Sequence, residues 1–598
     1  MKTKSLLSLG AMSLATVAFA QSTYTDLYYT GGFVNAYYSA GGHLVNAGSY
    51  SVGSLEGPTY TGNVDENCNI FISVANGQRL SVNEAISAGT FSIHDYNVTG
   101  VNTGGSGNSY SATWNQNGKT GWVTTIQVAD RKTLNITGDF VGNFETNTTL
   151  MSKGQDTYTR IELAANAVIN IAGDMHIYNN TTPVKPEGSS NTNIRNNGLN
   201  FLIYGEPMIK EDNVRGESYF NLGGDVYMYD KNITAAYWGA TPTNRVTLSF
   251  NVLSATIGGV IHMDEDYYDG ERVLDLQTKL MDYADNAATY DVYFDDVSRS
   301  FGGIDGSGII KVGAERAKNI ALSFTNATNS AWIGSLTSGN ADTKINVLMN
   351  GEGKQSMIIK ETHEGEGRKV PDTLNGGGLR DIAFYTEMDN KIGFNSVDVQ
   401  KGTFELGGYA ELKHGSLKVS SSNAKFVVGG YQADTLGTVN FEAARITAGT
   451  IGISFNQEAS DVLNFATSGE YALGDGFTAG KFHVSNPSSL TIELDYLPVE
   501  GSDIKEQLAD LGGSMEWEIM YFESTNLTEE TISDIIVKVV DQSGNVIDGV
   551  DATLSLLGEA DSYYGISATI TSAVPEPATV AGIAGLLALA FAAYRRRR

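Results

Sequence analysis

Cysteine and proline are both scarce in this chain of 598 residues. The single cysteine, Cys68, excludes an intrachain disulfide. With 10 prolines against 68 glycines, turns must be built mainly from Gly and Asn. Large exported proteins can do without disulfides when an extended sheet supplies the burial that small secreted domains lack. Stability must therefore come from packing and hydrogen bonds.

Basic residues are also few. The chain has 39 Lys and Arg against 68 Asp and Glu, for a formal net charge of −29. A phosphate backbone is bound by clustered Lys and Arg, so nucleic acid is excluded as the expected partner. An acidic surface instead suits solubility outside the cell and low non-specific binding.

The motifs of common catalytic sites are missing. There is no His-Glu-x-x-His, no Gly-x-Ser-x-Gly, no phosphate loop and no pair of cysteines, and only seven histidines occur. We interpret His94, which precedes Asp95, and His262 as ordinary polar strand residues rather than as a base with its orienting carboxylate. The sequence thus predicts no catalytic residues and no enzyme.

The N-terminus has the features of a secretion signal. Lys2 and Lys4 precede an apolar stretch from Leu6 to Phe19, and Ala18 and Ala20 supply the small residues of a cleavage site. A buried N-terminal helix is the alternative. We expect residues 1–20 to be removed and the mature protein to begin at Gln21.

The C-terminus has the features of a membrane span. Ala578 to Tyr594 is uncharged and roughly 17 residues long, the lower limit for crossing a bilayer. Clustered arginines mark the cytoplasmic side, and here they are Arg595, Arg596, Arg597 and Arg598. We expect one transmembrane helix, with a buried core helix as the alternative, and everything before it outside the cell.

A short proline motif precedes this span. It consists of Val574, Pro575, Glu576 and Pro577, and its two prolines favour an extended segment that a processing enzyme can thread. The motif, apolar stretch and arginine run together resemble the PEP-CTERM sorting signal of bacterial envelope proteins. The resemblance covers residues 574–598. It implies recognition by an exosortase-type transpeptidase, loss of the tail, and delivery to the cell surface or extracellular matrix. It implies no biochemical activity.

The rest of the chain contains a loose repeat. Three segments read apolar, Asn, apolar, small, Gly, Asp, apolar; they are Leu134–Phe140, Ile169–Met175 and Phe220–Val226. Such a pattern predicts two short strands joined at a corner, where Gly adopts positive φ and Asp bonds its own backbone. We expect Asn135, Asn170 and Asn221 to stack as a polar ladder inside successive turns.

A looser Gly-Gly pattern recurs in Ile257–Val260, Leu406–Tyr409 and Val428–Tyr431, the last two 22 positions apart. A step of about 20 to 25 residues predicts an all-β fold, a right-handed parallel β-helix, with an array of β-sandwiches as the alternative. Residues 304–313 and 397–406 resemble the glycine-punctuated rungs of autotransporter passenger domains and related adhesins. The C-terminal barrel of autotransporters is absent, and the sorting tail takes its place.

Two regions depart from this repeat. Val273 to Tyr290 has apolar residues at helical spacing and predicts an inserted amphipathic helix. After about residue 441 the strands lengthen, and we expect a helix from Asp503 to Gly512 and a hairpin through Asp541 to Asn545. The expected domains are therefore a repeat body, residues 21–440, and a β-rich C-terminal domain, residues 441–573, that caps it.

Acidic clusters and paired tyrosines are the remaining candidates for a site. Asp264, Asp266 and Asp295 could hold calcium or supply a pair of carboxylates for glycoside hydrolysis, but solvated loop charge is the preferred interpretation. We therefore predict no metal or cofactor. Three tyrosine pairs could stack on sugars, although strand propensity explains them as well; they are Tyr28–Tyr29, Tyr37–Tyr38 and Tyr267–Tyr268.

These features together predict a structural or adhesive surface protein that contacts matrix polysaccharide or other surface proteins through the side of its β-helix. A polysaccharide lyase or glycoside hydrolase on the same scaffold is the alternative, and a self-associating matrix component is a third hypothesis.

Overall fold

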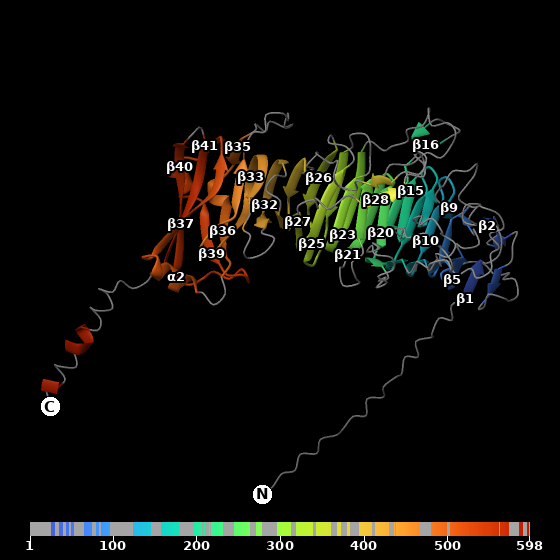
Figure 1. Ribbon diagram of the computed structural model, residues 1–598, viewed down its shortest axis with the longest axis horizontal. Helices are drawn as coiled ribbons and strands as arrows, with labels where there is room; N and C mark the ends of the chain where they lie inside the picture. The colour runs from blue at the N-terminus through green and yellow to red at the C-terminus, as the bar shows by residue number, and fades with distance from the viewer. Residues whose placement is uncertain are drawn as a thin grey trace, which may run out of the picture.

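The structure of the protein is a computed structural model. The described residues are 25–29, 35–39, 43–46, 50–52, 65–73, 79–82, 85–95, 123–144, 157–179, 197–205, 208–209, 214–215, 217–230, 244–263, 271–277, 296–312, 319–338, 343–359, 368–371, 379–382, 394–408, 413–429, 436, 438–465, 480–498, 503–560, 563–572, 585–589 and 595–596. They are mostly β-strand, as expected, with few helices. The strands follow one another along the long axis of an elongated body, from β1 and β2 at one end to β40 and β41 at the other (Figure 1).

Most strands pair in parallel, and consecutive strands of the chain belong to different ladders. In the N-terminal half there are three ladders. The first contains β7 (Ile86–Ala88), β10 (Thr133–Ile136), β13 (Val168–Ile171), β18 (Tyr219–Leu222) and the first half of β21 (Ser254–Met263). The second contains β1 (Thr25–Tyr29), β5 (Cys68–Ser73), β8 (Phe91–Asp95), β11 (Phe140–Phe144), β14 (Met175–Asn179), β19 (Val226–Asp230) and the second half of β21. The third contains β2 (Asn35–Ser39), β6 (Arg79–Val82), β9 (Val123–Val128), β12 (Thr157–Leu163), β15 (Asn197–Gly205), β20 (Asn244–Asn251) and β22 (Glu271–Gln277).

Period-two alternation sends every second side chain into one shared core. In β13, for example, Ile169 and Ile171 are buried while Val168 and Asn170 are half-buried. Phenylalanines from all three ladders, such as Phe140, Phe201 and Phe220, are fully buried there. Each such side chain contributes roughly 1.5–3 kcal/mol to folding. Burial shared between successive strands therefore replaces the missing disulfides.

One long strand, β23 (Asp296–Val312), continues all three ladders. It pairs with both halves of β21 and with β22. The helix expected from Val273 is therefore wrong at its start, because Val273 to Gln277 belong to β22. The side chains from Arg272 to Gln277 are all buried, on both faces of the strand. Leu276, one of the apolar residues at helical spacing, lies in this strand, where burial on both faces leaves no alternation to distinguish a strand from a helix. The rest of the expected helix, residues 278–290, lies outside the described residues.

Parallel pairing continues in the C-terminal half. The first ladder runs through β24 (Asn319–Phe324), β26 (Lys344–Met349), β30 (Ser396–Val399), β32 (Lys413–Gly429), β33 (Thr438–Phe455), β35 (Lys481–Val484) and β38 (Ser524–Thr525). The second runs through β25 (Ser330–Ser338), β27 (Lys354–Ile359), β31 (Gly402–Gly408), β32, β33, β36 (Leu490–Tyr496) and β39 (Ile536–Val540). Leu406 pairs with Val428, the two residues of the 22-position repeat. The domain boundary expected at residue 441 falls inside β33.

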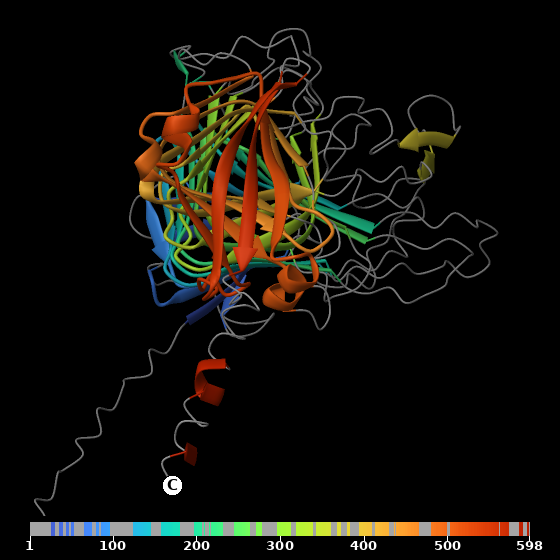
Figure 2. The same ribbon diagram turned by 90° about the vertical axis from the view of Figure 1, so that its left-hand side faces the viewer.

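Antiparallel strands lie at the C-terminal end. The third ladder reappears as β33, β34 (Val462–Phe465) and β37 (Ser514–Phe522), and β41 (Tyr563–Ser572) then pairs antiparallel with β37 and with β40 (Val550–Ala560). In the view turned toward this end, these strands lie in front of the parallel ones (Figure 2). Short antiparallel pairs also join β1 to β4 (Tyr50–Val52), β2 to β3 (His43–Asn46), β16 (Met208–Ile209) to β17 (Val214–Arg215), and β28 (Arg368–Pro371) to β29 (Leu379–Ile382).

The local predictions for the C-terminal region are confirmed. Helix α2 (Ile504–Asp510) begins after Asp503, whose side chain accepts a hydrogen bond from the Lys505 backbone. Gly512 and Gly513 follow it at positive φ. The turn after β39 closes through a hydrogen bond from the Asp541 backbone to Asn545. A second short helix, α3 (Glu529–Ile532), follows β38, and a 3₁₀ turn, η4 (Pro487–Ser489), precedes β36.

Within the described residues, no helix is both long and apolar enough to cross a membrane. Most of the span expected from Ala578 to Tyr594 lies outside these residues. Its described part, 585–589, is helical and exposed.

Candidate functional site

The repeated asparagines form a ladder across the first ladder of strands. Asn170 donates from its Nδ2 to Oδ1 of Asn135 at 2.8 Å, and Asn221 donates in the same way to Asn170 at 2.9 Å. The stacking prediction is confirmed, but the asparagines are half-buried on the outer side of their strands and not inside the turns. They alternate with buried residues such as Leu134 and Ile136, so the period of two places them outward.

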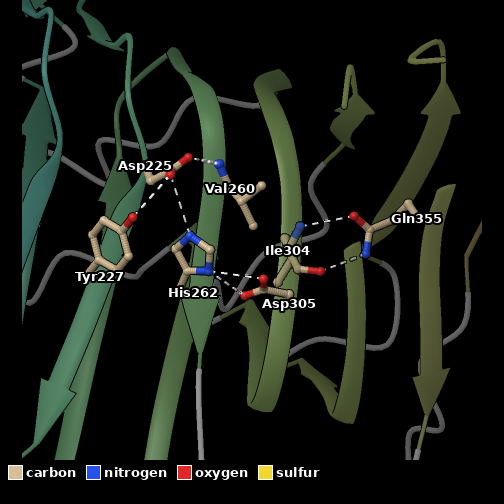
Figure 3. A network of polar contacts seen from close by, with 7 residues as sticks. All are labelled: Asp225, Tyr227, Val260, His262, Ile304, Asp305 and Gln355. Carbon is tan, nitrogen blue, oxygen red and sulfur yellow. Dashed lines mark hydrogen bonds and ion pairs between the residues drawn. The ribbon is translucent and has the colours of Figure 1, made fainter. Parts of the chain in front are cut away.

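The repeated aspartates tie each repeat to the next. Oδ1 of Asp139 accepts a hydrogen bond from the Asp174 backbone at 2.9 Å, and Oδ1 of Asp174 accepts one from the Asp225 backbone at 2.8 Å. Asp225 does the same for the Val260 backbone at 2.7 Å (Figure 3). The expectation that each Asp bonds its own backbone is therefore wrong. The backbone N–H at the corner of each repeat needs a hydrogen-bond acceptor, and the Asp carboxylate of the preceding repeat provides it.

The glycines of these corners are required by close packing. A Cβ on Gly173 would lie 2.2 Å from Oδ1 of Asp139 and 2.7 Å from the carbonyl carbon of Gly138. A Cβ on Gly224 would lie 2.1 Å from Oδ1 of Asp174. Neither glycine has positive φ. Glycine is thus needed because successive corners approach closely and not because of a left-handed backbone.

Aromatic rings stack on the outer face of the second ladder, immediately beyond these corners. His176, Tyr227 and His262 occupy paired positions of β14, β19 and β21. The centroids of His176 and Tyr227 are 4.9 Å apart, and those of Tyr227 and His262 are 4.6 Å apart. Two residues further along the strands, the rings of Tyr178 and Tyr229 are 4.4 Å apart. We call these five residues the ring face.

The imidazole of His262, at one end of this face, lies between two carboxylates (Figure 3). Nδ1 of His262 is 2.9 Å from Oδ1 of Asp305 in β23, and Nε2 is 3.6 Å from Oδ2 of Asp225 before β19. The Tyr227 hydroxyl donates to the same Oδ2 at 3.3 Å. A chain of polar contacts therefore runs from Tyr227 through Asp225 and His262 to Asp305.

This arrangement changes how readily the groups ionise. The hydrogen bond to Asp305 raises the pKa of His262, and the charges of Asp305 and Asp225 add to this effect, while burial opposes it. Burial raises the pKa of Tyr227, with the Asp225 and Asp174 carboxylates contributing. The site therefore favours a protonated imidazole between two carboxylates.

The same geometry limits the chemistry of the site. Asp225 and Asp305 lie at opposite nitrogens of the imidazole, so they do not converge with His262 on one cation. Across the part of the chain that the structure describes, no group of three or more His, Cys, Asp or Glu side chains is placed to hold a metal ion. The arrangement suits hydrogen bonding and proton exchange with a ligand on the outer surface.

A second polar cluster lies further along the outer face of the same ladder. Nζ of Lys354 is 3.0 Å from Oε2 of Glu405, and Lys425 pairs closely with Glu493 and lies 3.8 Å from Asp495. Burial raises the pKa of Asp495 to about 6, against the opposing charge of Lys425. This cluster is built from ion pairs, whereas the ring face is built from stacked rings.

Most residues named from the sequence lie outside the described residues. These are Ala18, Ala20 and Gln21 of the cleavage site, Asp264, Asp266 and Asp295, the tyrosines at 267 and 268, the motif from Val574 to Pro577, and Arg597 and Arg598. Arg595 and Arg596 are described as exposed and helical. The pairs Tyr28–Tyr29 and Tyr37–Tyr38 lie in β1 and β2, and His94 lies in β8.

Sequence reasoning missed four members of the ring face. His176, Tyr178, Tyr227 and Tyr229 follow the Gly-Asp step at its second and fourth positions, in Asp174–Tyr178 and Asp225–Tyr229. Extending the repeat by three residues would have shown these alternating rings. His262 was interpreted as an ordinary strand residue, because Asp305 is distant in the sequence.

No protein-family model matches the chain, and no curated protein sequence matches it. The candidate site is therefore interpreted from its own geometry.

Proposed function

We propose that this chain is an exported structural or adhesive protein of the cell surface or extracellular matrix, with a body that is a right-handed parallel β-helix. Consecutive strands that join different parallel ladders support this fold, because each turn of a β-helix places one strand in each ladder. The acidic composition and the single buried cysteine are consistent with a body that works outside the cell.

The observation that carries the adhesive role is the outer face of the second ladder. It presents the ring face over β14, β19 and β21 and the ion-pair cluster over β27 to β36. Both are spread across several strands on a nearly continuous side of the body. Such a surface suits contact with an extended partner more than capture of a small molecule in a pocket.

The delivery of the protein is proposed from the sequence features at its two ends. An exosortase-type enzyme would recognise Val574 to Pro577, and the apolar segment from Ala578 would be a temporary membrane anchor. Replacing Pro575 and Glu576 by Ala should leave the tail attached and the protein in the membrane fraction, while the unmodified protein loses the mass of the tail. Mass spectrometry of surface and membrane fractions tests this. An unmodified surface protein that keeps its tail would contradict it.

A polysaccharide-active enzyme is the second candidate, and His262 is the observation that favours it. An imidazole held by one carboxylate and beside a second can exchange protons with a substrate. Release of reducing ends or unsaturated sugars by the full-length chain, lost in both His262→Gln and Asp305→Asn, would establish this activity. Product formation that persists in both variants would exclude these residues from it.

A further inference from the structure

The ring face has an unusual orientation for aromatic side chains at a surface. The planes of its neighbouring rings are within 17° of parallel, and the Tyr178 and Tyr229 planes are within 7°. The rings therefore cover one another's faces along the ladder. Their edges, with the tyrosine hydroxyls, are what remains for a ligand, whereas Nδ1 of His176 is buried and both nitrogens of His262 face carboxylates. A ligand is therefore recognised mainly by hydrogen bonds to hydroxyl groups.

The ring face has hydrogen-bonding capacity to spare and is held in place before any ligand arrives. Among the described residues, nothing hydrogen-bonds the Tyr178 hydroxyl, although its ring is stacked and half-buried. Stacking against Tyr229 and the polar contacts of His262 restrict these side chains in the free protein. Binding then loses little side-chain entropy.

The charges around the ring face select the class of ligand. Asp225 and Asp305 flank His262, and Asp174 is near enough to raise the pKa of Tyr227. Three carboxylates at one face repel an acidic polymer and accept hydrogen bonds from hydroxyl or ammonium groups. A neutral or amine-bearing ligand therefore fits this face, and an acidic one does not.

The surface chemistry also favours a glycan over a protein partner. Protein interfaces have an apolar centre, whereas the exposed large aliphatic side chains of the described residues lie elsewhere, such as Leu511, Ile536 and Val546. The ring face spans three neighbouring strands, from β14 to β21, which is roughly 10 Å at ordinary strand spacing. This length accommodates a short stretch of a polysaccharide chain.

We propose that the ring face, His176, Tyr178, Tyr227, Tyr229 and His262, is a binding site for a neutral or amine-bearing glycan chain. The chain lies along the ladder axis, with its hydroxyl or ammonium groups bound by tyrosine hydroxyls and the flanking carboxylates. This inference rests on the adhesive function proposed above and names its site and ligand class.

The test is calorimetric titration of the full-length chain with three soluble oligosaccharide series, built from neutral hexose, amine-bearing hexosamine and uronic acid. Tyr178→Phe removes one hydroxyl and keeps the stacked ring, so it should weaken binding of the neutral or amine-bearing series about 3- to 10-fold. Tyr521→Phe, which removes a hydroxyl from β37, is the matched control and should bind as the unmodified protein does. Thermal melting of both variants checks that they are folded.

The possible results separate this site from the broader function. Glycan binding that is unchanged in Tyr178→Phe and in Tyr178→Ala with Tyr229→Ala would overturn the ring face as the site but leave the adhesive function standing. Tightest binding of the uronic acid series would overturn the ligand class. Binding of a surface protein but of none of the three series would overturn the glycan site and move the adhesive role to protein contacts.

Discussion

The Gly-Asp repeats of residues 133–263 and the C-terminal ladders of residues 344–540 share one pattern of parallel pairing but link their strands differently. In the first region, asparagines, aspartates and stacked rings repeat at the same register positions. In the second, ion pairs such as Lys354–Glu405 and Lys425–Glu493 connect the strands. One hydrogen bond between asparagines, from Asn464 to Asn440, also occurs there. Buried alternation is common to both regions, so it specifies the fold, and the outward side chains are free to differ.

Adding a side-chain atom where the corners approach closely should have the largest effect on stability. Gly173→Ala places a Cβ against Asp139 and the Gly138 backbone, and we expect it to lower the free energy of unfolding by about 1–3 kcal/mol. In the second region, a Cβ on Gly452 would meet the flexible end of Lys425 at 3.0 Å, so Gly452→Ala should cost less. Urea denaturation followed by fluorescence measures both.

The matched control for these two variants is Gly558→Ala, where a Cβ would meet nothing within 4 Å. We expect it to be close to neutral. Equal destabilisation by Gly173→Ala and Gly558→Ala would contradict the view that corner packing requires glycine.

Substitutions in the asparagine ladder should have the next largest effect on stability. Asn170 both accepts from Asn221 and donates to Asn135, so Asn170→Ala loses two hydrogen bonds and should cost about 1–2 kcal/mol. Asn464→Ala loses the one bond to Asn440 and should cost about half as much. The difference between their urea midpoints is the measurement, and a larger loss for Asn464→Ala would reverse the comparison.

The two regions should also respond to different ranges of pH. The pKa of His262 is raised above its ordinary 6.5, so its stabilising contribution is complete below pH 6.5 and is lost as pH rises through the folded-state value. The groups that face it are Asp225, Asp305 and Tyr227. His262→Asn should therefore flatten the fall in melting temperature above pH 6.5. A variant that melts with an unchanged pH profile would argue against this linkage.

Asp495 should affect the stability of the protein at lower pH than His262 does. Its pKa is raised from 3.8 to about 6, so the folded protein holds a proton that the unfolded chain has released. Its contribution is complete below about pH 4 and is lost by about pH 6. Lys425, Glu493, Lys354 and Glu405 face it. Asp495→Asn should flatten the dependence of the melting temperature on pH between pH 4 and 6. Above pH 6.5 that dependence should be unchanged.

The ion pairs of the second region should give the smallest effect. Lys425 and Glu493 are partly exposed, and such pairs contribute less than about 1 kcal/mol. Lys425→Met keeps most of the side chain and should change stability only slightly, and less still in high salt. Denaturation at low and high ionic strength measures this, and a loss as large as that of Gly173→Ala would be inconsistent with ion pairs of this kind.

The sequence predicted those features that depend on neighbouring residues. The strands on either side of the Gly-Asp step, the stacking of Asn170, helix α2 and the pairing of Leu406 with Val428 all follow from local pattern or from a visible repeat. Contacts between residues that do not occupy equivalent positions of the repeat were less accessible. The approach of Asp305 to His262 depends on which strands become neighbours, and the inserted segments between repeats make the spacing of those strands in the sequence irregular.

The same reasoning explains the wrong predictions. Val273 to Gln277 is buried on both faces, and such a run has no alternation to distinguish it from a helix. Asn135 was expected inside because stacked amides can satisfy one another's hydrogen bonds there, but its buried neighbours Leu134 and Ile136 fix the opposite orientation. Comparing the repeats at every position, including the residues after the Gly-Asp step, would predict both the outward orientation of the asparagines and the rings that were missed.

The most direct test of the proposed function is a glycan array probed with the full-length chain, with reducing-sugar and unsaturated-product assays on each bound glycan. The proposal predicts binding to neutral or amine-bearing polysaccharides without release of product. Product from any bound glycan would contradict the adhesive function, and no binding to any polysaccharide would contradict the glycan site.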